Sequence, residues 1–318
     1  AYRSKVAPVD PGSAGKCTAP PPSSDGDPSL LSQPPWENRA PKCKPKEWTL
    51  KMPSFAEAVH FPVGRREYIL ANLRSKDAES CRMWMDYYLA NPNAGHFPEY
   101  LCELSDREWA LRQWNESPSQ RWNPYTLRDG SWASVPERML ALYGAAALPG
   151  ILTTLSVAPD INYASLGMVE SPSLATVWAE AWATKKKFRK QACAWFTRFP
   201  KAAAGGLLPV ALGASGKQRG YCESVLRWME ANGLGDSLRQ VASEYQATEG
   251  LEEILAYDPL QELPAKMPAL PSWFHPAKAE APRTLSGTSL SPTAVANLAL
   301  MVAVSTLETP YAGLAQTD

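Results

Sequence analysis

The densest group of side chains that could do chemistry in this 318-residue sequence is a basic run between two expected helices. It consists of Lys185, Lys186, Lys187, Arg189 and Lys190. Positive charge at the start of a helix opposes the helix macrodipole, a local cost that a bound anion would offset. The run therefore predicts a patch for phosphate or an acidic partner, or else a solvated turn whose long side chains cover Trp182 and Phe188. We favour the solvated turn.

A second group with chemical potential is rich in arginine and tryptophan. Its members are Arg107, Trp109, Arg112, Trp114, Arg121, Trp122, Arg128 and Trp132. Such a surface could stack nucleic-acid bases or grip a peptide. However, lysine plus arginine and aspartate plus glutamate both total 32, so no net charge draws the chain toward a polyanion. We therefore favour internal packing of these tryptophans.

The residues that usually carry catalysis are scattered. The three histidines, His60, His96 and His275, lie in different segments and show no metal-ligand spacing. Residues 213–217 resemble a phosphate loop, but the glycine spacing differs and Gln218 stands where Ser or Thr would bind Mg²⁺. No G-x-S-x-G nucleophile motif occurs. The sequence thus predicts no catalytic residue, no metal site and no cofactor, and we expect a protein that is not an enzyme.

Cysteine usage and hydropathy bear on the compartment. The six cysteines are widely spaced without a C-x-x-C pair, which is typical of reduced thiols in a cytosolic protein; a Cys17–Cys43 bridge is the alternative. No apolar run reaches the roughly 18 residues that a membrane-spanning helix needs. We expect a cytoplasmic protein. Because the chain begins at Ala1 without a signal-peptide pattern, we also expect it to be processed or to be a fragment.

Proline and helix signals divide the first part of the chain in two. Residues 1–53 are rich in proline and poor in periodic apolar residues, so we expect an extended or mobile segment with Trp36 and Trp48 as its anchors. Residues 54–132 carry capping-box patterns at Ser54 and Ser105 and apolar residues at helical spacing. We predict a helical, tryptophan-rich subdomain with long loops, including helices over residues 66–73, 78–89 and 105–115.

The strongest helical pattern lies in residues 133–257. Ser134 and Ser171 are expected N-caps, the second followed by a proline at the first helical position. Further apolar stripes at i, i+3, i+4 and i+7 begin near Phe188, Cys222 and Leu238. The links between these helices are short, and short links force antiparallel neighbours. We predict an all-α fold, a HEAT-like α-solenoid of antiparallel helix pairs.

Residues 258–318 change character again. Prolines recur from residue 259 to residue 282 and break any helix, which predicts an extended, proline-rich strap. Ser291 followed by Pro292 then begins a last helix, expected over residues 293–307.

Two stretches of the sequence resemble a large bacterial family. The first is AWFTRFPKAA at 194–203 with LPVALG at 208–213, and the second is LPAKMPALPSW at 263–273 with PYAGL at 310–314. Over residues 135–315 the chain resembles proteins that pair a WGR domain with a long domain of unknown function and are often labelled molybdate metabolism regulators. The resemblance implies a HEAT-like region, a longer full-length protein, and partners such as a MoxR-type ATPase or a von Willebrand A-domain protein. It supplies no catalytic residue, and no W-G-R motif occurs in this chain.

These features lead to one principal hypothesis and two alternatives. The principal hypothesis is a non-enzymatic helical-repeat scaffold or adaptor that mediates protein–protein interaction. The first alternative is a nucleic-acid-associated regulator that uses the basic run at 185–190. The second is the non-catalytic part of a larger enzyme whose active site lies outside this chain.

Overall fold

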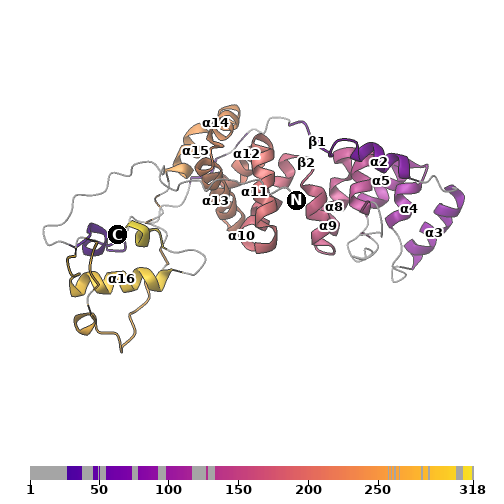
Figure 1. Cartoon of the computed structure of the whole chain (residues 1–318). Coiled ribbons are helices and arrows are strands. Elements are labelled where there is room, and N and C mark those ends of the chain that lie inside the picture. The colour runs from indigo at the N-terminus through magenta and orange to yellow at the C-terminus, as the bar shows by residue number, and fades with distance from the viewer. Residues whose placement is uncertain are drawn as a thin grey trace. The chain divides into compact units, whose positions relative to one another are not determined.

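The chain folds into two compact units (Figure 1). Unit 1 comprises residues 1–45 and 256–318, and unit 2 comprises residues 46–255. The computed structural model describes residues 27–37, 46–48, 50, 55–73, 78–91, 98–116, 127, 133–256, 258, 260, 263–264, 266–280, 282–285, 287–305 and 311–316. Most of these residues are helical, and the strands among them form one two-stranded sheet. The predicted all-α class is thereby confirmed.

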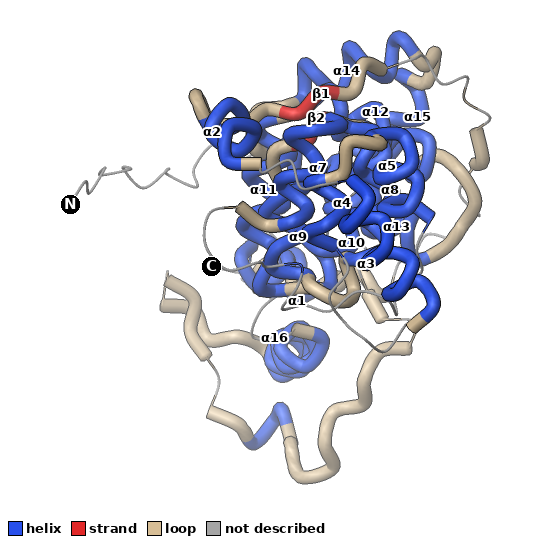
Figure 2. Tube along the Cα trace, turned by 90° about the vertical axis from the view of Figure 1, so that its right-hand side faces the viewer, coloured by secondary structure: helices blue, strands red, loops and turns tan. Residues whose placement is uncertain are grey.

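The helices of unit 2 are short and closely spaced. They are α2 (Arg65–Asn72), α3 (Ala78–Ala90), α4 (Pro98–Glu103), α5 (Arg107–Glu116), α7 (Val135–Tyr143), α8 (Leu148–Thr154), α9 (Pro159–Leu166), α10 (Ala175–Thr184), α11 (Arg189–Arg198), α12 (Pro200–Ala211), α13 (Lys217–Ala231), α14 (Gly235–Glu244) and α15 (Thr248–Leu255). The 3₁₀ helices η3 (Gly144–Ala147), η4 (Pro172–Leu174) and η5 (Lys186–Phe188) connect some of them. Strands β1 (Ala58–Val59) and β2 (Val169–Glu170) pair antiparallel and lie side by side in Figure 2.

Local capping signals begin several of these helices. The Ser134 hydroxyl accepts a hydrogen bond from the Glu137 amide at 3.3 Å, and Pro136 lies in the first turn of α7. The Ser171 hydroxyl accepts from the Ser173 amide at 3.2 Å, so the helix predicted here starts with η4 and continues as α10. Prolines also open α9 and α12, where a missing amide hydrogen costs no hydrogen bond.

Two predicted helix starts are wrong. Residues 55–57 are not helical and lead into β1, so no helix extends from Ser54, which itself lies outside the described residues. Pairing with β2 competes with local helix formation here, because the strand partner satisfies the backbone groups that a helix would use. In the second case Asp106 rather than Ser105 is the cap, since Asp106 Oδ1 accepts from the Trp109 amide at 3.1 Å.

The helices of unit 2 contact one another along two rows. In the first half α7 contacts α4 and α9, whereas α8 contacts α5. In the second half α13 contacts α10 and α15, whereas α12 contacts α14. The rows meet in the pairs α4–α5, α8–α9, α10–α12 and α13–α14. Figure 1 shows the same progression from α4 to α15, and these helices pack mainly on near neighbours in the chain, whereas α2 packs on the more distant α7.

Aromatic side chains join the two halves of unit 2. The Tyr163 ring of α9 lies 5.1 Å from the Trp178 ring of α10 and 4.2 Å from the Phe188 ring of η5. Trp178 and Trp195 stack at 6.1 Å, and the Trp195 indole donates to the Val169 carbonyl at 2.8 Å. Trp178 and Trp195 are fully buried and belong to the core of unit 2.

Residues 46–48, 50 and 55–61 lie against these helices, and we call them the arm. The Trp48 amide donates to the Leu212 carbonyl at 2.8 Å, and the arm ends in β1 and the residues after it. Trp48, Phe55 and Phe61 pack against the core of unit 2. The predicted role of Trp48 as an anchor is confirmed.

Unit 1 is built around α16 (Pro292–Val304), which packs against α1 (Ser29–Ser32) and the 3₁₀ helices η7 (Pro276–Lys278) and η8 (Ala312–Gln316). The Ser291 hydroxyl accepts from the Ala294 amide at 3.2 Å, as the sequence predicts. The helix ends at Val304 and not at residue 307. Its buried neighbours include Leu31 and Tyr311, and Trp36 packs on the same cluster as expected.

The four predicted segments thus distribute over two units. The predicted subdomain 54–132 and the predicted repeats 133–257 share unit 2 and one hydrophobic core. Segments 1–53 and 258–318 supply unit 1, apart from the arm. Within unit 2 the sequence analysis missed α4, α9 and α15, which have six or eight residues each and so show about two turns of periodicity at most.

Candidate interaction groove between helices α7 and α9

The basic run lies at the junction of α10 and α11. Lys185 follows the last residue of α10, and η5 contains Lys186 and Lys187. Arg189 and Lys190 form the first residues of α11. The predicted position of the run at a helix start is therefore confirmed.

Two lysines of the run contact side chains of α9. Lys187 Nζ lies 2.6 Å from Oδ1 and 2.8 Å from Oδ2 of Asp160. Lys185 Nζ donates to the Tyr163 hydroxyl at 3.2 Å. The Lys187–Asp160 pair is exposed, so solvent and salt screen it and it adds little to stability. Its effect is to neutralise part of the positive charge of the run.

The run also covers aromatic rings, as the solvated-turn interpretation predicts. The Arg189 guanidinium lies 6.0 Å from the Trp182 ring centre, and Arg189 Nε donates to the Trp182 carbonyl at 2.9 Å. Lys187 Nζ lies 5.7 Å from the Phe188 ring centre. The aliphatic stems of these side chains therefore shield apolar surface while their charged ends reach solvent.

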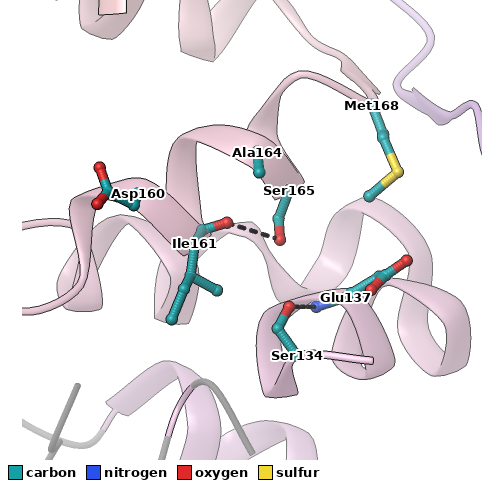
Figure 3. A pocket seen from close by; sticks show the side chains of 7 residues that line it. All are labelled: Ser134, Glu137, Asp160, Ile161, Ala164, Ser165 and Met168. Carbon is teal, nitrogen blue, oxygen red and sulfur yellow. Dashed lines mark hydrogen bonds between the residues drawn. The ribbon is translucent and has the colours of Figure 1, made fainter. Parts of the chain in front are cut away.

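Asp160 also lines a groove with a volume of about 510 Å³ between α7 and α9. Its lining residues, labelled in Figure 3, are Ser134, Glu137, Asp160, Ile161, Ala164, Ser165 and Met168. Binding pockets in proteins occupy roughly 300–1,000 Å³, so the groove is large enough for one or two side chains of a partner. Through Asp160 it adjoins the basic run.

The inside of this groove is mostly apolar. Ile161 and Ala164 lie on α9, and Met168 lies in the turn after it (Figure 3). The Ser165 hydroxyl donates to the Ile161 carbonyl at 3.1 Å, and the Ser134 hydroxyl caps α7. Because both hydroxyls are engaged within their own helices, the groove offers mainly apolar contact to a bound group.

Two ion pairs border the groove. Arg65 Nε lies 2.7 Å from Glu137 Oε1, and Arg65 Nη2 lies 2.9 Å from Glu137 Oε2. This fork is partly buried, and the hydrogen bond from Arg65 to Glu137 raises the pKa of the guanidinium. Lys187 holds Asp160 at the other border. Because each carboxylate already binds a cation, this arrangement suits binding more than acid–base catalysis.

The structure describes two of the three histidines. His60 Nε2 lies 2.8 Å from Glu170 Oε2, and the His60 ring lies 5.1 Å from the Phe199 ring. His275 belongs to unit 1, and His96 lies outside the described residues. Within the described part of the chain, no group of three or more His, Cys, Asp or Glu side chains could hold a metal ion.

Cys102, Cys193 and Cys222 form no disulfide bond. Cys102 and Cys222 are buried and Cys193 is half-buried. Burial raises the pKa of Cys222 to about 12 and also raises the pKa of Cys193, so neither thiol is activated as a nucleophile. The pair Cys17 and Cys43 lies outside the described residues.

The arginine- and tryptophan-rich group is only partly described. The Trp114 indole is fully buried and donates to the Ala147 carbonyl at 2.8 Å, as expected for internal packing. Trp109 is half-buried and lies 5.9 Å from the Arg82 guanidinium. The other two tryptophans, Trp122 and Trp132, lie outside the described residues.

The glycine-rich residues 212–216 connect α12 to α13, and Lys217 begins α13. Arg219 Nη1 donates to the Gly213 carbonyl at 2.6 Å, so an internal side chain binds this turn. Across the residues that the structure describes, every helix is too short or too polar to cross a bilayer.

The groove itself was missed by the sequence analysis. Five of its seven lining residues belong to α9 or to the turn after it, and α9 was not predicted. A usable signal is present, since Pro159 and Asp160 are typical of the first turn of a helix. What the sequence lacks is any sign that α9 lies beside α7.

Comparison with known proteins yields one distant relative. The chain is 26% identical over 245 residues to "Uncharacterized protein YehI" of Escherichia coli (strain K12). The match spans 71% of this chain but only 20% of YehI, so the chain covers about a fifth of that protein. No family model matches the chain. No solved structure matches it either.

Proposed function

We propose that this chain is a non-enzymatic scaffold, a HEAT-like α-solenoid whose grooves bind protein partners. The observation that carries the proposal is the two-row packing of α4 to α15, in which helices contact near neighbours along the chain. Arrays of this kind present extended surfaces without a closed catalytic cavity. We regard the protein as cytoplasmic, in keeping with the lack of a disulfide bond at Cys102, Cys193 and Cys222.

The α7–α9 groove is the proposed contact surface. An apolar centre bordered by charged pairs resembles the arrangement of protein interfaces, where a buried apolar anchor is surrounded by a polar rim. The partner would place an apolar side chain against Ile161 and Met168. The family resemblance makes a MoxR-type ATPase or a von Willebrand A-domain protein the first partners to test.

Site-specific photo-crosslinking tests this proposal. A benzoylphenylalanine at Ile161 should form a reproducible adduct with a purified candidate partner, and a second one at exposed Ser243 on α14 should not. Ala164→Arg, at an exposed position of α9, should block the adduct by filling the groove without disturbing the core. Adducts of equal yield at both probe positions, or an adduct that survives Ala164→Arg, would count against the groove.

The nucleic-acid alternative has less support, because Lys187 already pairs with Asp160 and the chain has no net charge. It predicts salt-sensitive binding that is lost in a combined Lys185→Ala, Lys186→Ala and Lys187→Ala variant. Under the scaffold proposal, DNA and RNA keep their mobility at low salt. A catalytic region elsewhere in a longer protein is compatible with a scaffold role for this part.

A further inference from the structure

We propose that the arm occupies a peptide-binding groove of unit 2, and that a partner protein binds there by offering an extended segment of the same chemistry. The arm contacts α11, α12, α13 and α15, the strand β2, and the residues Ser171 and Tyr245, and these elements form the proposed groove. This site adjoins the α7–α9 groove at Met168, which lines that groove and whose carbonyl accepts from the His60 amide of the arm, but its two aromatic anchors lie on other helices.

The first anchor of the arm is Phe55. A Cβ atom on Gly205 of α12 would lie 2.6 Å from Phe55 Cζ, so the absence of a side chain at Gly205 creates the hole that the ring fills. The Phe55 ring lies 6.3 Å from the Tyr245 ring. The Tyr245 hydroxyl donates to the Gly205 carbonyl at 2.6 Å and fixes the wall of the hole. The hole therefore selects a flat aromatic side chain.

The second anchor is Trp48. A Cβ atom on Gly250 of α15 would lie 2.8 Å from Leu212 Cδ2 and 3.1 Å from Trp48 Cε2, so the glycine makes room for both side chains. The Trp48 amide donates to the Leu212 carbonyl at 2.8 Å. The Trp48 indole nitrogen is buried without a hydrogen-bond partner among the described residues. A partner that satisfied this donor would bind more favourably than the arm does.

The arm also binds through its backbone, because its strand β1 pairs with β2. Ala58 pairs with Glu170 and Val59 with Val169, and the His60 amide donates to the Met168 carbonyl at 2.7 Å. Main-chain pairing of this type accepts many sequences, whereas side-chain pockets provide specificity. Strand addition to β2 is thus available to a foreign segment.

A carboxylate adds the remaining selectivity. The Ser171 hydroxyl donates to the Glu57 carboxylate, and it lies 2.6 Å from the Ser173 hydroxyl. A charge-assisted hydrogen bond is stronger than a neutral one, so this position favours an acidic residue. The resulting ligand is an extended peptide that needs one carboxylate but no net negative charge, since residues 46–61 contain two glutamates and two lysines. It has aromatic residues at the positions of Trp48 and Phe55 and a carboxylate at that of Glu57.

The arm can dissociate from the groove because the helices around it contact one another directly and do not pack through the arm. Helix α12 contacts α10, α13 and α14 directly, and α13 contacts α15. Trp48 and Phe55 are only partly buried against this core. Displacing the arm would expose the holes that Phe55 and Trp48 fill and the edge of β2. A peptide with the same side chains would occupy both holes and pair with β2.

Peptide binding in trans tests the proposal. A fluorescent peptide of residues 46–61 is titrated into the full chain and into a full-chain Trp48→Ala/Phe55→Ala variant, whose own arm lacks both anchors. We expect at least about tenfold tighter binding to the variant, since its holes are empty. Adding Gly205→Leu should abolish the gain, whereas Gly220→Leu, at an exposed position with open space around it, should preserve it.

Equal affinity for both chains, or no binding to either, overturns the proposal. Light scattering should give one peptide per single chain; a dimer of chains would instead make the arm of a second copy the occupant and overturn the partner claim. If the double variant does not fold, hydrogen exchange on the unmodified chain decides. The amides of Trp48 and His60 should exchange at least about tenfold faster than those of α12, through local opening. Equal rates would make the arm an inseparable part of the core.

Discussion

The two units build their cores from contacts of very different sequence range. In unit 2 helices pack on near neighbours in the chain, from α4 through α15. In unit 1 the Asp27 carboxylate accepts from the Ser291 amide at 3.0 Å, and the Asn297 side chain donates to the Leu31 carbonyl at 2.8 Å. These pairs are separated by 264 and 266 residues, so unit 1 is closed by joining two distant segments.

The difference in sequence range shows how each unit is stabilised. Helices that pack on adjacent helices close only short loops, whereas long-range contacts must offset a larger loop-closure entropy. Unit 2 also has much the larger hydrophobic core. The buried residues described for the two cores have no member in common. We therefore expect the units to respond separately to core mutations.

The largest expected effect is that of Trp178→Ala in unit 2. Trp178 is fully buried between Tyr163 and Trp195, and truncation should cost about 3–5 kcal/mol of unfolding free energy through lost burial and a cavity. Hydrogen exchange should show lost protection in α10 to α13 and unchanged protection in α16. The control Trp273→Ala, at a side chain 77% exposed, should change stability by less than about 0.5 kcal/mol. Loss of protection in α16 as well would contradict the separation of the cores.

The matching change in unit 1 is Leu31→Ala. Leu31 is 1% exposed and lies in the core with Val295 and Met301, so its truncation should cost about 2–5 kcal/mol. Here α16 should lose protection while α13 keeps it, the reverse of the Trp178→Ala pattern. Gln33→Ala, at an exposed position just after α1, serves as the control. If Leu31→Ala leaves α16 protected, the long-range segment does not stabilise unit 1.

Close backbone packing within unit 2 can be tested with two glycines. A Cβ atom on Gly206 of α12 would collide with the Pro172 carbonyl oxygen of η4, so Gly206→Ala should cost about 1–3 kcal/mol through overpacking. Gly220→Ala on α13 meets open space and should stabilise the chain by up to about 1 kcal/mol, because alanine favours the helix. Chemical denaturation followed by tryptophan fluorescence measures both. A stabilising Gly206→Ala would show that η4 and α12 are not closely packed.

The smallest expected effect is a loss of the stability of unit 1 at high pH. Burial, with a contribution from Asp258, raises the pKa of Tyr311 to about 12. An unfolded tyrosine ionises near pH 10, so the stabilisation by the neutral phenol is complete below about pH 10 and is lost as the pH rises toward 12. Circular dichroism of thermal unfolding between pH 9 and 12 measures this loss.

Tyr311→Phe is the control for this pH effect. The variant should lose about 0.5–1.5 kcal/mol at neutral pH, because the Tyr311 hydroxyl no longer donates to the Leu260 carbonyl. It should then show a weaker decline above pH 10 than the unmodified chain. An identical decline in both proteins would assign the loss to other groups.

Most helix positions could be predicted from the sequence, whereas the packing of the helices on one another and on the arm could not. The caps at Ser134 and Ser291 and the core positions of Trp178 and Trp195 follow from signals within a few residues. The wrong helix start at Ser54 shows the limit of such signals, since β1 pairs with a strand far along the chain. For the candidate groove, the sequence pointed to the basic run but not to α9 beside it.

The sequence by itself determined the all-α class, most helix positions and the absence of a recognisable catalytic motif. It could do so because capping and the 3.6-residue period act within one or two turns of a helix. Only the tertiary structure decided that the arm lies on α12, that α1 packs on α16, and that α7 and α9 enclose a groove. Each of these depends on matched surfaces between segments distant in the chain, and no local pattern encodes which surfaces will match.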